Sequence, residues 1–353
     1  MNIDFLPLLV SAISCIVVIR MITPFAINIG LVDKPNLRKK HIGNIPLVGG
    51  VSIFIAVVIS LLTTQIDINQ QKNLLLAMII VVGTGVLDDH RDLSVNTRVL
   101  LHIIAVTVVV VLDNVVLNSL GWIFGSSEFK LHAWAIFFTI FAVIGVMNAI
   151  NMSDGIDGLS GSLSLITLLF ISYFAYIAGQ YDYLLIALLV CSTLIPFLLF
   201  NLGVFGKSRK VFMGDAGTTL LGLVIAVLLI ALSQGDSAAF RPVAALWLLA
   251  IPLIDTFTIM SRRMIKRKSP FKADREHLHH FFVRSGISDR RALLIIVLLS
   301  FSVTFLGFWM EVNNVAEWKM FALFLSIFLL YLFATIHAWK KTCKIFISIY
   351  IPT

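Results

Sequence analysis

Two adjacent carboxylates stand where an apolar segment ends, in the sequence VVGTGVLDDHRD (residues 81–92). Asp88 and Asp89 close a predicted helix, although the carboxyl termini of helices favour cations over anions. Adjacent aspartates also repel one another and need a cation, a proton or hydrogen bonds to coexist. A divalent metal ion or a cationic partner would meet that need. The alternative interpretation is that the pair only marks the edge of a membrane.

A second acidic motif, NMSDGIDG (residues 151–158), places Asp154 and Asp157 three positions apart, each followed by glycine. Glycine lets a ligand approach the backbone closely, and Asn151 adds a neutral oxygen ligand. Ordinary turn chemistry explains one Asp-Gly pair, but two of them beside an Asn favour a ligand-binding loop. The spacing and the missing closing Glu exclude a calcium-binding helix-loop-helix.

A third carboxylate, Asp215, lies between two glycines in VFMGDAGTTLLG (residues 211–222). Asp is a good N-cap, so a purely structural role is one interpretation. A helix amino terminus behind a Gly-rich turn is also where phosphate groups bind. Asp215 could hold a metal ion against such a phosphate, and hard oxygen ligands of this kind suit Mg²⁺, with Mn²⁺ as the alternative.

Three histidines follow in a basic segment, SRRMIKRKSPFKADREHLHHFFVRSG (residues 261–286). His277, His279 and His280 invite a zinc interpretation, but no Cys and no HExxH motif accompanies them. Beside basic residues such as Arg263, hydrogen bonds from these histidines to phosphate or sugar oxygens are the better interpretation.

Another candidate anion site lies in the first polar loop, VDKPNLRKKHIGNIPLVGG (residues 32–50), where Lys40 and His41 precede two glycines. Clusters of Lys and Arg also mark the cytoplasmic side of membrane proteins. That explanation is equally good for this loop, and it is the better one for the basic run near residue 265.

The composition identifies the elements that must position these motifs. Of the 353 residues, 59% are hydrophobic and only 13% are charged, whereas soluble domains carry about 25% charged residues. Apolar runs long enough to span a bilayer recur along the whole chain. We therefore expect an all-α, polytopic integral membrane protein of one domain, residues 1–353. The predicted spans are 4–27, 46–65, 73–88, 98–114, 132–150, 159–178, 182–203, 216–234, 241–261, 292–311 and 318–339.

The distribution of Lys and Arg orients these eleven spans. Most of the 27 basic residues fall on one side of the predicted bilayer, which the positive-inside rule assigns to the cytoplasm. The amino terminus is then periplasmic, the carboxyl terminus is cytoplasmic, and all the polar motifs lie in cytoplasmic loops. The net charge of +8 reflects this topology, so it gives no indication of nucleic-acid binding.

Three further features have structural interpretations. The segment 73–88 is short for a crossing, which predicts that it ends at the interface or leans on neighbours. Asp255 lies inside a span, where carboxylates are costly unless they are functional or paired, and a structural partner is favoured. The three cysteines are expected to be core thiols, because their odd number and apolar settings indicate neither disulfides nor a metal site. They are Cys15, Cys191 and Cys343.

Five motifs in order, HIGNIPLVGG, LDDHRD, NAINMSDGIDGL, VFMGDAGTT and DREHLHH, closely resemble those of the polyprenyl-phosphate N-acetylhexosamine-1-phosphate transferases. This superfamily includes the translocase of peptidoglycan synthesis, which is less similar in the first loop and around the histidines. GLVDKPNLRKKHIGNIPLVGG and SPFKADREHLHH are most like the members that use UDP-GlcNAc and undecaprenyl phosphate. Those members start the synthesis of O-antigen and enterobacterial common antigen, components of the lipopolysaccharide-bearing cell surface.

The resemblance implies a reaction. A lipid phosphate in the inner membrane attacks the sugar-bearing phosphate of UDP-GlcNAc, releasing UMP and leaving GlcNAc on a lipid diphosphate. The enzyme would be a magnesium-dependent transferase with its site facing the cytoplasm. Apolar grooves between spans would hold the prenyl tail.

The resemblance also implies roles for particular residues. It places Mg²⁺ on Asp215 with Asn151 as a second ligand, and it matches Asp88 and Asp89 to the family's paired aspartates. Asp88 would position, or deprotonate, the lipid phosphate. The remaining residues would contact the substrates. Asp154, Asp157, Asn201 and Phe212 would lie near the nucleoside, with Phe212 stacked on uracil, and His277, His279 and the basic residues around them would grip the diphosphate and sugar.

Several alternatives stay open at this point. The reaction is either a single displacement or a two-step route with an Asp as covalent nucleophile, and the former needs only orientation and electrostatics. The donor could be another UDP-N-acetylhexosamine. A transporter of lipid-linked sugars is a third interpretation, but transporters place polar sites near the bilayer midplane. A homodimer is compatible with the sequence, which identifies no contact face for it.

Overall fold

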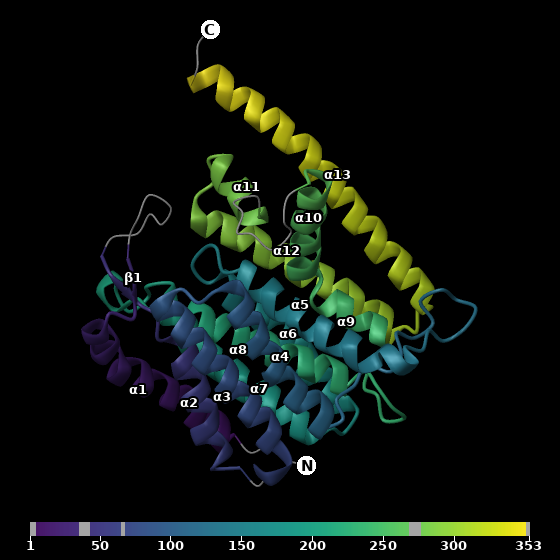
Figure 1. Ribbon diagram of the computed structural model, residues 1–353, viewed down its shortest axis with the longest axis horizontal. Coiled ribbons are helices and arrows are strands. Elements are labelled where there is room, and N and C mark those ends of the chain that lie inside the picture. Colours follow the sequence, from purple (N-terminus) through teal and green to yellow (C-terminus); the bar gives the residue numbers. More distant parts are fainter. Residues whose placement is uncertain (1–4, 35–42, 65–67, 268–276, 351–353) are drawn as a thin grey trace.

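Nearly all of the chain is helical (Figure 1). The computed structural model describes residues 5–34, 43–64, 68–267 and 277–350. The long helices are α1 (Leu6–Ile29), α2 (Gly49–Leu61), α3 (Ile68–Arg91), α4 (Val95–Leu112), α5 (Ala135–Met152), α6 (Leu159–Ile177), α7 (Tyr181–Asn201), α8 (Gly214–Ala231), α10 (Ala250–Ile265), α12 (Asp289–Val312) and α13 (Glu317–Tyr350). Two short helices, α9 (Pro242–Leu248) and α11 (Leu278–Arg284), flank α10, and a two-residue antiparallel ribbon joins β1 (Val32–Asp33) to β2 (Ile45–Pro46).

The prediction of an all-α, polytopic membrane protein is confirmed, with changes in detail. Among the described residues, nine helices are long and apolar enough to cross a membrane, and α9 with α10 makes a tenth, broken span. The remaining predicted span, 46–65, is only the 13-residue α2. The expectation that 73–88 would be too short to cross was wrong, because polar residues on both sides of it extend α3 to 24 residues.

Helix α8 is the centre of the bundle. It is apolar all round, and 89% of its membrane window is buried, against 28% for α1, α4 and α12. An apolar helix suits lipid and protein surroundings alike, so it is this burial that identifies α8 as the central helix. Helices α2, α3, α5, α6 and α9 pack around it, so the first turn of α8, with Asp215, is held by several neighbours at once.

Glycines in α2 and α3 let the backbones of these helices pack closely against α8. A Cβ added to Gly85 of α3 would lie 2.2 Å from the Cα of Ala216, and one added to Gly50 of α2 would lie 2.1 Å from the backbone nitrogen of Gly217. The backbones of α2 and α3 therefore touch the first turn of α8, as small residues allow in membrane bundles. This contact brings the end of α3, with its two aspartates, beside Asp215.

The predicted span 241–261 is not a single helix. It breaks at Leu249, where α9 and α10 meet at 83°, and α10 rises from the bundle toward the side that carries α11 and the β1–β2 ribbon (Figure 1). Pro252 follows the break closely, and proline lacks the N–H that a continuous helix would need. The bend carries Asp255 and the basic end of α10 toward the histidine segment.

We predict that Gly85→Ala lowers thermal stability, because the added methyl group must push α3 away from the backbone of α8. Overpacking of this kind costs about 1–3 kcal/mol. Gly83→Ala is the matched control, since it lies two residues away in α3 with open space around it and gains helix propensity. Thermal unfolding of both purified variants in detergent measures the difference. A Gly85→Ala protein as stable as Gly83→Ala would contradict the close contact.

Candidate active site

Asp88 is buried at the end of α3 and is paired with an arginine. Its Oδ2 lies 2.5 Å from Nη1 of Arg98, in the first turn of α4, and its Oδ1 accepts the N–H of Leu93 at 2.8 Å. The chain reverses between the two helices with Asp92 in the left-handed region, at φ 49°. The cationic partner that adjacent carboxylates require is therefore supplied by the protein itself.

Asp89 caps the central helix. Its Oδ1 accepts the backbone N–H of Asp215 at 3.0 Å, and its Oδ2 accepts the N–H of Ala216 at 3.4 Å. These N–H groups belong to the first turn of α8, which has no partners of its own for them and favours a negative charge. The two neighbouring aspartates thus face different cationic or partly positive groups, which explains how they coexist.

Asp215 is partly exposed at the start of α8. Its side chain is 35% exposed, its Oδ1 accepts the amide N–H of Asn151 at 2.7 Å, and its Oδ2 lies 3.6 Å from Arg98. Asn151 also donates to the hydroxyl of Thr218 at 2.8 Å. Asp88, Asp89, Asp215 and Asn151 are therefore one cluster, and Arg98 lies close to two of its carboxylates.

The loop between α5 and α6 is held by bonds to its own aspartates. Asp154 accepts the hydroxyl of Ser160 at 2.6 Å, and Asp157 forms an ion pair with Lys210. Gly158 has φ 78° directly before α6, a conformation that glycine adopts without strain. Asp157 is thereby joined to the segment before α8, and Asp154 to the first turn of α6.

Asn201 and Phe212 join this loop to the segment before α8. The amide of Asn201 accepts the N–H of Gly158 at 2.6 Å and donates to the carbonyl of Val211 at 2.9 Å, both in the interior. The contacts of Asn201 therefore fix two backbone segments. Phe212 is half-buried, and Nζ of Lys210 lies 5.0 Å from the centre of its ring, a cation–π distance.

The three histidines lie close together at the start of α11. His277 and His279 stack nearly parallel, with ring centres 5.7 Å apart, and His280 is 4.1 Å from His279. Burial, reinforced by the nearby imidazoles of His280 and His277, lowers the pKa of His279 to about 3. His279 is therefore a neutral hydrogen-bonding group at physiological pH. Arg263 is buried near the end of α10.

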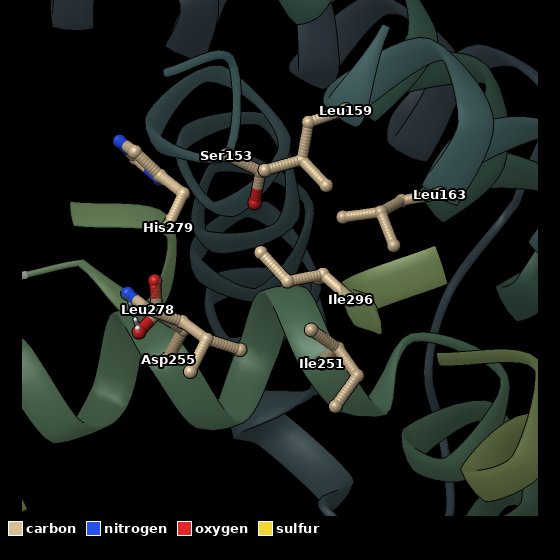
Figure 2. Close-up of a pocket in the computed structure, with 8 residues that line it drawn as sticks. All are labelled: Ser153, Leu159, Leu163, Ile251, Asp255, Leu278, His279 and Ile296. Atoms are coloured by element: carbon tan, nitrogen blue, oxygen red, sulfur yellow. Dashed lines mark hydrogen bonds between the residues drawn. The ribbon is translucent and has the colours of Figure 1, made fainter. Parts of the chain in front are cut away.

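A small cavity lies beside His279, between the ends of α5, α10 and α11 (Figure 2). It measures about 10 Å³, close to the minimum that holds one water molecule, and its polar lining comes from Ser153, Asp255 and His279. Among the described residues, the buried Nε2 atom of His279 has no hydrogen-bond partner. It lies 1.9 Å from where a Cβ of residue 155 would be, so any side chain at Gly155 would have to displace the imidazole of His279.

The structure brings most of the predicted residues close together and adds residues that the sequence motifs did not indicate. Arg98 and Lys210 neutralise Asp88 and Asp157, and Ser160 holds Asp154. The only available signal was that Arg98 is a basic residue at the predicted start of a span. Two predicted residues, Lys40 and His41, lie outside the described residues.

The fold and the site define a class: a polytopic membrane protein with clustered carboxylates and histidines at one end of its helices. Comparison with known proteins makes this more specific. The pattern of glycosyl transferase family 4 matches residues 72–233.

Relatives over most of the chain are undecaprenyl-phosphate alpha-N-acetylglucosaminyl 1-phosphate transferases. The one from Haemophilus influenzae is 39% identical over 338 residues, which are 96% of this chain and 95% of the relative. That from Salmonella typhi is 39% identical over 316 residues (89% and 86%), and that from Escherichia coli K12 is 40% identical over 313 residues (88% and 85%). The chain belongs to this family of glycosyl transferases.

We predict that Asn201→Ala destabilises the protein, because it leaves the N–H of Gly158 and the carbonyl of Val211 buried without partners. Each such group costs about 1–3 kcal/mol. Asn148→Ala is the control, since Asn148 donates only to Ile144 within its own helix. Thermal unfolding should separate the two variants clearly. Equal unfolding temperatures would mean that Asn201 does not hold the two segments.

Proposed function

We propose that this protein transfers GlcNAc-1-phosphate from UDP-GlcNAc to undecaprenyl phosphate, producing undecaprenyl-diphospho-GlcNAc and UMP. The observation that carries the proposal is the cluster of Asp88, Asp89, Asp215 and Asn151 at the ends of membrane helices. The names of the relatives support both the lipid acceptor and the GlcNAc-1-phosphate group. In such a reaction a lipid-anchored phosphate must meet a water-soluble nucleotide sugar, and a site at helix ends is where the two can meet.

The proposed location is the bacterial inner membrane, with the site on the cytoplasmic face, where nucleotide sugars are made. The asymmetry of Lys and Arg supports this orientation. The product would be the first lipid-linked intermediate of O-antigen and enterobacterial common antigen synthesis.

The proposed chemistry is a single displacement at phosphorus. An oxygen of the lipid phosphate forms a bond to the sugar-bearing phosphorus, and the bond from that phosphorus to the bridging oxygen breaks, so that UMP leaves with the electron pair. The second pKa of a phosphate monoester is about 6, so the attacking group is already largely ionised at neutral pH. Asp88 is committed to Arg98 and to the N–H of Leu93, which favours a positioning role for Asp88 over proton abstraction.

The residues around Asp215 fit a bound Mg²⁺. Among the described residues, no three His, Cys, Asp or Glu side chains form a closed metal cage, and Mg²⁺ usually takes only one or two carboxylates together with waters and substrate phosphates. Asp215 offers a partly exposed carboxylate, and a half-turn of the Asn151 amide would offer its oxygen. When bound, Mg²⁺ would neutralise the charge that builds up on the diphosphate; Mn²⁺ has the same ligand preference.

The other residues would hold the two ends of the nucleotide sugar. The nucleoside would bind beside Asp154, Asp157 and Phe212. Asn201 would hold the backbone segments that carry these residues in place. Lys210 lies over one face of the Phe212 ring, so uracil that stacks on that face would displace Lys210, which could then contact a phosphate. The histidines at the start of α11 would contact the diphosphate and sugar, together with Arg263, which lies near the end of α10.

Nucleotide release by the purified full chain tests this proposal directly. Given UDP-GlcNAc, undecaprenyl phosphate and Mg²⁺, the protein should release UMP, and release should stop when either the lipid or the metal is left out. Release of UDP would mean that the sugar alone moves, and the phosphate-centred assignment would be wrong. No release with any UDP-sugar would favour transport of a lipid-linked sugar instead.

We predict that Asp215→Asn abolishes UMP release while the protein still folds, because the amide keeps the shape of the side chain but removes its charge. Thermal unfolding should show a protein close to the wild type in stability. Retention of more than about a tenth of wild-type turnover at saturating Mg²⁺ would contradict the metal assignment, since an interaction specific to the transition state is worth more than that.

A further inference from the structure

Asp255 is a buried carboxylate to which the proposed chemistry gives no part. It lies on α10, six residues after the break at Leu249, and is 7% exposed. A carboxylate inside a membrane bundle is costly unless polar groups satisfy it. The groups that satisfy Asp255 therefore indicate what it does.

Three donors from two other elements converge on this carboxylate. Oδ2 lies 2.9 Å from Nδ1 of His277, and Oδ1 accepts the backbone N–H of Leu278 at 3.0 Å and the hydroxyl of Tyr331 at 2.8 Å. Tyr331 belongs to α13, whose membrane window is only 11% buried. Asp255 thus ties together α10, the start of α11 and the last helix.

The bonds to Asp255 fix the start of the histidine helix. Helix α11 has only seven residues, and its own N-cap residue, His277, makes no side-chain cap. Asp255 supplies the cap from another helix by accepting the N–H of Leu278, while it also holds the imidazole of His277. The apolar side of α11 is anchored separately, because Leu278 and Phe282 pack on a small core of Leu159, Leu163 and Ile296.

The same bonds determine where the next histidine lies. In Figure 2, Asp255 and Leu278 occupy one wall of the small cavity, and His279 extends from the adjacent position toward the loop that carries Ser153. His279 meets that loop at Gly155, and its ring stacks on His277. A shift at Leu278 would therefore move both imidazoles relative to the acidic loop.

We propose that Asp255, fixed by the hydroxyl of Tyr331, is a positioning residue for phosphosugar transfer: it orients His277 and sets the start of α11, and with it the position of His279. The inference rests on the proposed function for the reaction that these histidines serve. Because Nδ1 of His277 is hydrogen-bonded to Asp255, only Nε2 of His277 can contact a substrate oxygen. The last helix thereby contributes to the site without contacting the substrate.

The test compares Asp255→Asn and Tyr331→Phe with Tyr173→Phe, a control on the exposed face of α6. Asparagine keeps one acceptor oxygen, but its NH₂ group only donates hydrogen bonds, so it cannot accept at both of the positions where Asp255 accepts. We expect kcat for UMP release to fall about tenfold or more in Asp255→Asn and about threefold in Tyr331→Phe, with KM for UDP-GlcNAc nearly unchanged, as for an interaction felt mainly in the transition state. Tyr173→Phe should match the wild type.

A double-mutant cycle distinguishes positioning from general stability. If Asp255 acts through His277, then Asp255→Asn should cost little further activity in a His277→Gln background, because coupled residues are not additive. Fully multiplicative losses, or an Asp255→Asn variant as active as the wild type, would overturn the inference. If Asp255→Asn does not fold, Tyr331→Phe is the deciding variant. A turnover of Tyr331→Phe equal to that of Tyr173→Phe would overturn the positioning role of Asp255.

Hydrogen–deuterium exchange tests the positioning role of Asp255 independently of the proposed function. The amides of residues 278–284 should exchange faster in Asp255→Asn and Tyr331→Phe than in the wild type or in Tyr173→Phe, because the cap is weakened. This readout requires no turnover. Wild-type protein that releases no UMP would refute the proposed function, whereas unchanged exchange in both variants would refute the positioning role alone.

Discussion

The whole site depends on one contact, the meeting of the α3 and α8 backbones at Gly85 and Ala216. Without side chains between them, the end of α3 reaches the first turn of α8, and Asp89 can accept the N–H groups of Asp215 and Ala216. Every carboxylate of the cluster is positioned by this approach. The rest of the bundle keeps α8 central and so keeps its amino terminus in place.

Charge balance follows from the same contact. Three aspartates in a small space repel one another, and the protein offsets the repulsion with the partial positive charge of a helix amino terminus and with Arg98. Asp88 is buried and paired with Arg98, and Asp89 is bound to two N–H groups of α8, whereas Asp215 accepts a hydrogen bond from Asn151 and keeps a side chain that is 35% exposed. The division of roles between neighbouring aspartates is therefore a consequence of where each side chain finds its positive partner.

The sequence predicted the class of fold and the members of the site better than their arrangement. Long apolar runs define membrane helices whatever their neighbours, and motifs rich in Asp, Gly and His stand out against them. Other features depend on tertiary contacts. Nothing local in the sequence indicates that Arg98 folds back on Asp88, ten positions earlier, or that the span 241–261 bends at Leu249.

Asn201 and Asp255 illustrate the same limit. The family resemblance placed Asn201 near the nucleoside, and the structure shows its amide joined to two backbone segments. Asp255 was expected to have a structural partner, but only packing of α10 against α11 and α13 reveals that the partners include His277 and Tyr331. Residue types indicate which chemistry a site can perform, whereas long-range packing determines which atoms of those residues take part.

The central claim is that the cluster at the amino terminus of α8 receives the diphosphate and its metal ion. Crystals of the full chain grown with UDP-GlcNAc and Mn²⁺, with diffraction recorded at the manganese absorption edge, would locate the ion. The account predicts an anomalous peak at about 2.0–2.2 Å from a carboxylate oxygen of Asp215, next to the diphosphate. A peak on the histidines of α11, or nucleotide bound with no ion at Asp215, would contradict it.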